Sequence, residues 1–131
     1  MIIDTSALLA IVLGESDRVA YVDALTEAPS RRMSAANWLE ATLVLEGCAN
    51  AIALDRFEAF VAEAKIELVP VSIEQAGLAR HAFRLYGRGR HRACLNFGDC
   101  FAYALAKETA FPLLFKGSDF THTDIEPALK D

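Results

Sequence analysis

Short apolar segments alternate with longer segments of helical spacing along the whole chain. We expect strands at residues 1–4 (MIID), around Met33, at 66–71 (IELVPV) and at 112–115 (PLLF). We expect helices at residues 6–13, 16–27, 38–52, 54–65, 73–87 and 99–110. Such an alternation is typical of a parallel sheet covered by helices on both faces. The sequence therefore predicts an α/β fold, and the lack of repeats or linkers predicts a single domain over residues 1–131.

The composition, 53% hydrophobic and 24% charged, is that of a globular protein. No stretch approaches the roughly 18–20 apolar residues that span a bilayer. Asp4 interrupts the first apolar run, so we expect neither a membrane anchor nor a signal peptide. The cysteines, Cys48, Cys94 and Cys100, form no C-x-x-C pair, which argues against a disulfide scaffold or a structural zinc site. We expect a cytoplasmic protein in which Cys48 and Cys100 are buried.

The charge is unevenly distributed. A net charge of −5 argues against nucleic-acid binding, yet residues 76–98 contain no acidic residue. This segment contains Arg80, His81, Arg84, Arg88, Arg90, His91 and Arg92. It could be a solvated, flexible connection, or a mobile arm that contacts phosphates. We favour the arm because the segment leads directly into Asp99.

Four carboxylates follow or open the expected elements at one end of the sheet. Asp4 directly follows the first strand, Glu40 lies in the first turn of a helix, Asp99 opens a helix, and Asp119 follows the last strand. Ligands of open α/β sheets bind beyond the carboxyl ends of the strands. Carboxylates that converge without cations repel one another, and Mg²⁺ or Mn²⁺, which prefer oxygen ligands, would relieve that repulsion.

Each acid also has a structural explanation. Asp99 could cap its helix, Glu40 could form a capping box with Asn37, and Asp119 could be an ordinary turn residue. Asp4 is the hardest to explain in this way, because burying an unpaired carboxylate costs several kcal/mol. Ser6 could cap the following helix or orient Asp4 through its hydroxyl.

Four segments resemble one known family. They are MIIDTSALLAIVLGE, SAANWLEA, RHRACLNFGDCFAYALA and PLLFKGSDFTHTDI, and together they resemble VapC-type toxins of the PIN-domain family over the full chain. The resemblance implies a three-layer fold with a central parallel β-sheet flanked by α-helices. It also implies a metal-dependent endoribonuclease that forms one half of a type II toxin–antitoxin pair.

The resemblance places the family's acidic site on Asp4, Glu40 and Asp99. Many members carry a fourth acid after the last core strand, and in members that read T-x-D-x-D-F it would fall on Gly117, which has no side chain. Asp119, or with less support Asp124, would replace it. This departure leaves the fourth ligand and the occupancy of a second metal open.

The expected reaction is hydrolysis of an RNA phosphodiester bond by metal-activated water. Asp4 and Asp99 would ligate Mg²⁺ or Mn²⁺, and Glu40 would bind it through water or orient the attacking water. Asp119 would complete the acidic ring and contact any second ion. The resemblance implies a product with a 5′-phosphate and a 3′-hydroxyl.

RNA contacts are expected from the basic segment and from residues beside the acids. The expected contacts to the phosphate backbone are Arg88, Arg90 and Arg92, and the expected orienting residues are Ser6 and Asn96. Tyr86 and Phe97 could stack on exposed bases, although core packing is the favoured role for Phe97.

Other classes of protein fit less well. A receiver domain needs paired acids after its first strand and an acceptor aspartate after a middle strand, whereas Asp55 lies in a helical pattern. A haloacid-dehalogenase-type phosphatase needs D-x-D, but the second position after Asp4 is Ser6. A catalytically inactive PIN-like module that binds RNA or protein is the remaining alternative.

The resemblance also implies partners. They are an RNA substrate, a VapB-type antitoxin whose C-terminal segment covers the active-site groove, and a second copy of the chain in a homodimer and a larger toxin–antitoxin assembly. The expected helices at 38–52 and 54–65 could contribute the binding surface, although amphipathic helices usually face their own core.

Overall fold

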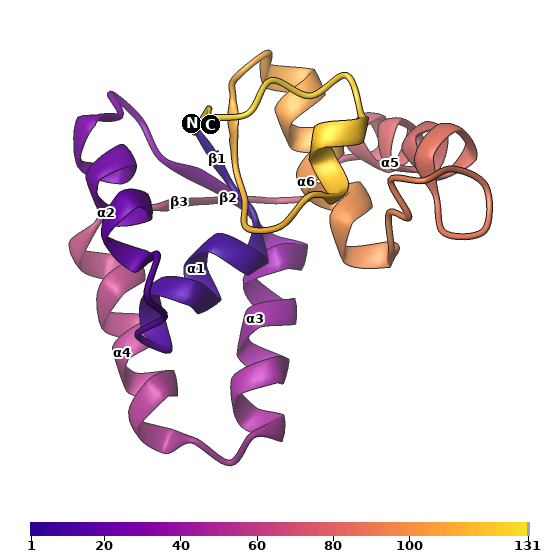
Figure 1. The fold of residues 1–131 in the computed structure, drawn as a ribbon. Coiled ribbons are helices and arrows are strands. Elements are labelled where there is room, and N and C mark those ends of the chain that lie inside the picture. The colour runs from indigo at the N-terminus through magenta and orange to yellow at the C-terminus, as the bar shows by residue number, and fades with distance from the viewer. Residues whose placement is uncertain (131) are drawn as a thin grey trace.

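The apolar segments form one parallel sheet with the strand order β3-β2-β1-β4 (Figure 1). The computed structural model describes residues 1–130. The strands are β1 (Ile2–Ile3), β2 (Arg32–Ser34), β3 (Glu67–Val69) and β4 (Leu113–Leu114). The helices are α1 (Thr5–Val12), α2 (Arg18–Glu27), α3 (Ala35–Gly47), α4 (Ala51–Glu63), α5 (Ile73–Tyr86), α6 (Phe97–Thr109) and the short 3₁₀ helix η1 (Asp119–His122). The expected α/β class is confirmed.

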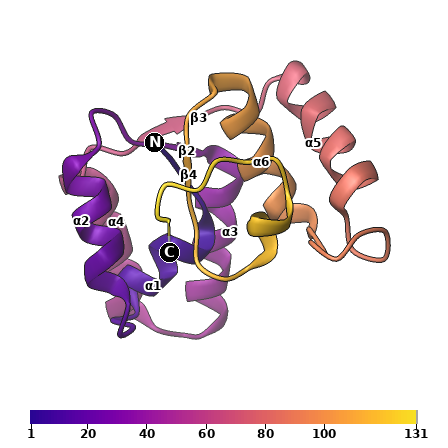
Figure 2. The same ribbon diagram turned by 45° about the horizontal axis from the view of Figure 1, so that its top comes forward.

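The sheet separates two hydrophobic cores. Ile2 and Leu113 pack into the core beneath α5 and α6, whereas Ile3 and Leu114 pack into the core beneath α1–α4. Successive side chains of a strand point to opposite faces, so a strand of only two residues contributes to both cores. The views from two directions show the same three layers (Figure 2).

Capping residues move several helix boundaries from their expected positions. The Ser34 side chain accepts a hydrogen bond from the Ala36 amide, so α3 begins before the expected Trp38. The Asn50 side chain accepts one from the Ala53 amide at 3.0 Å and begins α4 before the expected Leu54. Glu40 therefore lies in the second turn of α3, not in the first turn.

The direction in which successive strands are added to the sheet reverses at β1. It moves from β1 to β2 and β3 through α1–α4, then crosses to the other side of β1 through α5 and α6 to form β4. The boundary between β1 and β4 is thus the switch point at which open α/β sheets bind ligands. Asp4 and Asp119 follow the two strands that meet there.

The basic segment between α5 and α6 is closed at its base by backbone hydrogen bonds. The Arg88 amide donates to the Leu95 carbonyl at 2.9 Å, and the Leu95 amide donates to the Tyr86 carbonyl at 3.0 Å. Arg88, Arg90 and Arg92 are all exposed. The segment is an anchored loop with an exposed basic tip.

Two further expectations have direct outcomes. Within residues 1–130, every helix is too short or too polar to cross a membrane. Cys100 is buried as expected, but the expectation for Cys48 is wrong, because this residue follows the end of α3 and is exposed.

Candidate functional site

Asp4 lies at the junction of β1 and α1, where it is only 3% exposed. It is the N-cap of α1, and its Oδ2 accepts hydrogen bonds from the Ser6 amide at 3.1 Å and the Ser6 hydroxyl at 2.5 Å. Ser6 Oγ in turn accepts a bond from the Lys116 amide at 2.9 Å, just beyond β4. Asp4 is therefore the cap of α1. Of the two expectations for Ser6, the one in which its hydroxyl orients Asp4 is confirmed.

Asp99 lies in the first turn of α6. The Asn96 side chain accepts a bond from the Asp99 amide at 2.9 Å, and Asp99 Oδ2 accepts one from the Asn96 amide at 3.0 Å. This capping box fixes the orientation of the Asp99 side chain. It uses only Oδ2, so it leaves the other carboxylate oxygen for a ligand.

Glu40 projects from α3 toward α1 and α6. The Thr5 hydroxyl donates to Glu40 Oε1 at 2.6 Å, and Asn37 Nδ2 reaches the same oxygen at 3.4 Å. Asn37 Nδ2 also donates to the Gly98 carbonyl at 2.9 Å. The alternative explanation of Glu40, a capping box with Asn37, is wrong: Ser34 caps α3, and Asn37 is a fully buried link between α3 and α6.

Gly98 permits the close approach of Glu40 to α6. A Cβ atom at Gly98 would lie 1.9 Å from Glu40 Oε2, far inside van der Waals contact. Sequence reasoning missed Thr5, Asn37 and Gly98 as supporting residues. Only Asn37 carried a signal, its spacing from Glu40, and that spacing was interpreted as a cap.

The electrostatics show that the four carboxylates influence one another. Burial raises the pKa of Asp4 to about 7, opposed by the bonds from Ser6 and reinforced by the charges of Asp99 and Glu40. Burial also raises the pKa of Asp99 to about 6, reinforced by the charges of Asp119 and Glu40.

Arg88 is the cation that lowers the pKa of Asp99, which places the guanidinium within electrostatic reach of the acids. This influence is smaller than the effect of burial, so the acids as a group are not neutralised.

The donor set fits a hydrated oxygen-binding cation better than a closed protein cage. Among residues 1–130, no three Asp, Glu, His or Cys side chains are arranged as a ready ligand set. Glu40 is turned toward Thr5 and Asn37, so Asp4 and Asp99 are the candidates for direct ligands. Mg²⁺ is typically bound by one or two carboxylates and keeps several waters.

The region after β4 separates the two candidates for a fourth acid. Gly117 has φ +99°, a backbone conformation that favours glycine. Asp119 opens η1 and acts electrostatically on Asp99. Asp124 instead accepts hydrogen bonds from Tyr103 Oη at 2.7 Å and Lys107 Nζ at 2.9 Å, which help hold its pKa below the usual value.

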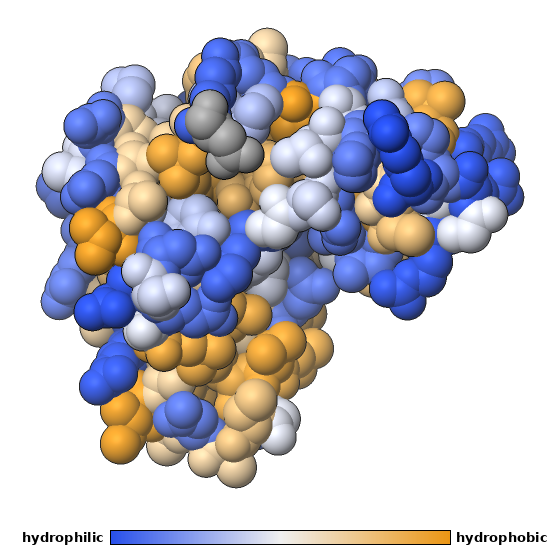
Figure 3. Space-filling view, viewed as in Figure 1, coloured by the Kyte–Doolittle hydropathy of each residue, from blue (hydrophilic) through white to orange (hydrophobic). Residues whose placement is uncertain are grey.

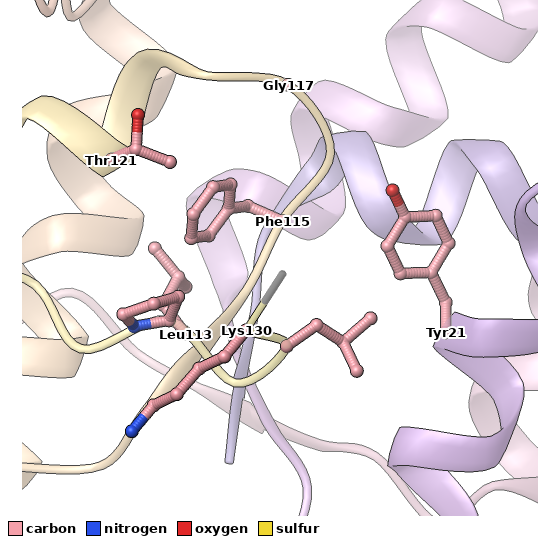
Figure 4. Close-up of a pocket in the computed structure, with 8 residues that line it drawn as sticks. Tyr21, Leu113, Phe115, Gly117, Thr121 and Lys130 are labelled. Carbon is pink, nitrogen blue, oxygen red and sulfur yellow. The ribbon is translucent and has the colours of Figure 1, made fainter.

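A cavity of about 370 Å³ lies behind this region (Figure 4). Tyr21 faces it from α2, and Phe115, Gly117 and Thr121 line it from the segment around β4 and η1. None of the four candidate acids lines this cavity. It is a separate hollow and not the acidic site.

Comparisons with known proteins agree with this geometry. A PIN domain family model matches residues 1–126. VapC ribonuclease Mb0625 of Mycobacterium bovis and ribonuclease VapC28 of Mycobacterium tuberculosis are each 47% identical over 130 residues, covering 98% of both chains. Ribonuclease VapC30 of M. tuberculosis is 47% identical over 125 residues, or 95% of both chains.

A solved structure has the same fold. The crystal structure of M. tuberculosis VapC20, described as a toxin that cleaves the sarcin–ricin loop, superposes with a TM-score of 0.75 over 95% of both chains. The two sequences are 13% identical. At that identity the likeness concerns the fold alone.

Proposed function

The chain belongs to the PIN domain family as a VapC-type toxin endoribonuclease, and we propose that it hydrolyses RNA phosphodiester bonds with a divalent cation held by Asp4 and Asp99. The observation that carries this proposal is the pair of buried carboxylates at the switch point of the sheet. Burial and mutual repulsion raise the pKa of both groups. A pair of carboxylates in this state gains most from a bound cation.

Mg²⁺ or Mn²⁺ suits these oxygen ligands. When bound, such an ion supplies an activated water and stabilises charge on the phosphoryl oxygens. Asp119, which opens η1 and repels Asp99, would extend the acidic ring on the β4 side.

The other residues of the site orient the carboxylates. Ser6 holds Oδ2 of Asp4, so the plane of that carboxylate is fixed. Thr5 and Asn37 hold Oε1 of Glu40, and the bond from Thr5 at 2.6 Å is the shorter of the two. These bonds support a role in which Glu40 would accept a hydrogen bond from the attacking water.

The anchored basic loop supplies the attraction for RNA. Arg88 acts electrostatically on Asp99, and Arg90 and Arg92 lie on the same exposed loop. These arginines would contact phosphates on either side of the scissile bond, while the acids alone would repel the substrate. Asn96 links the loop to Asp99 through the capping box.

As the toxin of a toxin–antitoxin pair, the protein has an antitoxin as its partner. We further propose a VapB-type antitoxin, a homodimer and a larger toxin–antitoxin complex that acts in the cytoplasm, where its RNA substrate is found. Exposed apolar residues on α3, among them Leu39 and Leu43, support a contact surface on that helix. In the space-filling view, hydrophobic residues gather over α3 at the edge of a hollow (Figure 3).

Cleavage of total cellular RNA with mapping of the 5′ ends tests this function. Wild type, Asp4→Asn and the control Asp55→Asn, which changes an exposed acid on α4, are each incubated with Mg²⁺, Mn²⁺ or EDTA. We expect discrete cuts that need metal, vanish in Asp4→Asn and persist in Asp55→Asn. Cuts that persist in Asp4→Asn would show that the site is wrongly assigned, and no cuts from folded wild type with metal would favour an inactive binding module.

A further inference from the structure

Phe97 is unusually exposed for an aromatic residue. It is the first residue of α6, and its side chain is 80% exposed, which overturns the expectation that it packs in the core. Its ring makes an edge-to-face contact with Phe101, with the centroids 4.8 Å apart. The ring is therefore held at one edge while much of its surface remains free.

Two apolar grooves meet at this ring. One, of about 450 Å³, is lined by Phe83, Phe97 and Phe101 together with Arg80. The other, of about 580 Å³, is lined by Phe97 and by Glu40 and Gly98 of the acidic site. Phe97 and Phe101 line both grooves and so separate the aromatic groove from Glu40, the one candidate acid that lines the second groove.

The charges around the aromatic groove favour an anionic ligand. Arg80 contributes to its lining, and the guanidinium of Arg90 lies 5.8 Å from the centroid of the Phe83 ring. Residues 76–98, which supply most of this surface, contain no acid. A surface with aromatic rings at its centre and guanidinium groups at its rim matches a nucleotide, whose base is flat and whose phosphate is negative.

The N-terminal end of α6 lines the second groove together with α3, which contributes Leu39, Glu40 and Leu43. An RNA strand whose phosphate reaches Asp4 and Asp99 must pass this end of the helix, because Asp99 lies in its first turn. Phe97 and Asp99 are two residues apart in α6 and point to different sides of the helix. A base whose backbone passes around this end of α6 would therefore meet the exposed face of Phe97, on the side of the groove that Glu40 lines.

We propose that Phe97 is a stacking platform for an unpaired RNA base beside the scissile phosphate, with Arg80 and Arg90 at the rim of the same subsite. This inference rests on the proposed function and adds a substrate subsite to it. The opposite occupant, a protein segment, would match the apolar rings but would leave the arginine rim without a partner. Stacking on a single ring tolerates every base, so the subsite selects single-stranded RNA and not a particular sequence.

The test is the equilibrium affinity for a short single-stranded RNA and for the same backbone with its bases removed. Both are measured in an Asp4→Asn background to prevent cleavage. Phe97→Ala should weaken RNA binding about 5- to 150-fold, the usual range for loss of one base stack. Phe97→Ala should leave the affinity for the abasic strand unchanged, and Phe97→Trp should retain the affinity for RNA.

Ile73→Ala is the matched control, because Ile73 is an apolar residue of α5 that is 86% exposed. It should change neither affinity. In a Trp38→Phe background, Phe97→Trp should also give a tryptophan signal that RNA quenches and the abasic strand does not.

The proposal would be overturned if Phe97→Ala bound RNA as tightly as the Asp4→Asn protein that retains Phe97. It would also be overturned if Phe97→Ala lost as much affinity for the abasic strand as for RNA. If Phe97→Ala lowers self-association in sedimentation and leaves RNA affinity intact, the ring belongs to a protein interface and the proposal is wrong. A folded wild type that binds RNA through Phe97 but cuts none would contradict the proposed function while preserving the subsite, so the two failures are distinguishable.

Discussion

Glu40 depends on the glycine that faces it across the interface between α3 and α6. The carboxylate is held by Thr5 and Asn37 on one side, and Gly98 leaves room for Oε2 on the other. Asn37 ties the two helices together by donating to the Gly98 carbonyl at 2.9 Å. The position of one of the four candidate site acids thus depends on a glycine of another helix.

Gly98→Ala should displace the Glu40 carboxylate without unfolding the protein. The added Cβ, at 1.9 Å from Oε2 and 2.7 Å from Oε1, displaces the carboxylate and breaks its bond from Thr5. The loss of that bond, about 1 kcal/mol, is offset by the helix preference of alanine over glycine, so stability should change little. The displaced carboxylate loses its geometry, and RNA cleavage should fall about 10- to 100-fold. Thermal unfolding and cleavage rates measure the two effects.

Gly77→Ala in α5 is the control, because a Cβ there meets nothing within 4 Å. It should leave cleavage unchanged and stabilise the protein by about 0.5–1 kcal/mol, the helix preference of alanine over glycine. Full cleavage by Gly98→Ala would show that the close approach has no catalytic importance.

The buried acids should make the metal-free protein less stable as pH rises. The pKa of Asp4 is about 7 when folded and 3.8 ordinarily, so between these values the folded state binds more protons than the unfolded state. This contribution to stability is fully present below pH 4 and is lost as pH rises toward 7. Above pH 7 the ionisation of Asp4 no longer changes the stability. Asp99, with a pKa of about 6, acts in the same direction.

Asp4→Asn should therefore stabilise the metal-free protein at pH 8 by of the order of 1–3 kcal/mol, since it removes the buried charge and asparagine still caps α1. Urea unfolding at pH 5 and pH 8 measures the difference. Asp124→Asn is the opposite case, because Lys107 and Tyr103 lower the pKa of the Asp124 carboxyl. Removing that charge should destabilise the protein at pH 8. A lower stability of Asp4→Asn at pH 8 would contradict the raised pKa of Asp4.

At the scale of elements, the N-terminal end of α6 combines the most functions. Asn96 caps the helix, Phe97 is exposed, Gly98 admits Glu40, and Asp99 faces the other acids. The sequence predicted Asp99 near the start of this helix but took it as the possible cap, whereas Asn96 is the cap and Asp99 completes a capping box with it. The exposure of Phe97 and the role of Gly98 could not be predicted, because both depend on where α3 packs.

The anchored basic loop preceding α6 should control RNA affinity through charge. Replacing Arg88, Arg90 and Arg92 with alanine should weaken RNA binding and reduce the salt slope by about 0.7 for each lost phosphate contact on a single strand. Binding of single-stranded RNA across a series of salt concentrations measures the slope. Arg56→Ala, which removes an exposed arginine from α4, should leave it unchanged. An unaltered slope in the triple variant would exclude the loop as the phosphate contact.

For the whole molecule, the alternation of apolar strands and helices was sufficient to predict the parallel sheet and its covered faces. The two-residue strands β1 and β4 were enough because each supplies one side chain to each core. The convergence of Asp4, Asp99 and Asp119 at one edge followed from the same topology. The network of Thr5 and Asn37 around Glu40 did not, since it joins three helices that are separated in sequence.

Binding of Mn²⁺ to the purified protein tests the central claim that Asp4 and Asp99 hold the cation. Electron paramagnetic resonance measures this binding as the loss of the signal of free Mn²⁺. Wild type should bind Mn²⁺, Asp4→Asn and Asp99→Asn should each weaken binding more than about tenfold, and Asp124→Asn should bind like wild type. Equal affinity in wild type and both site variants would contradict the assignment of these two carboxylates as the metal ligands.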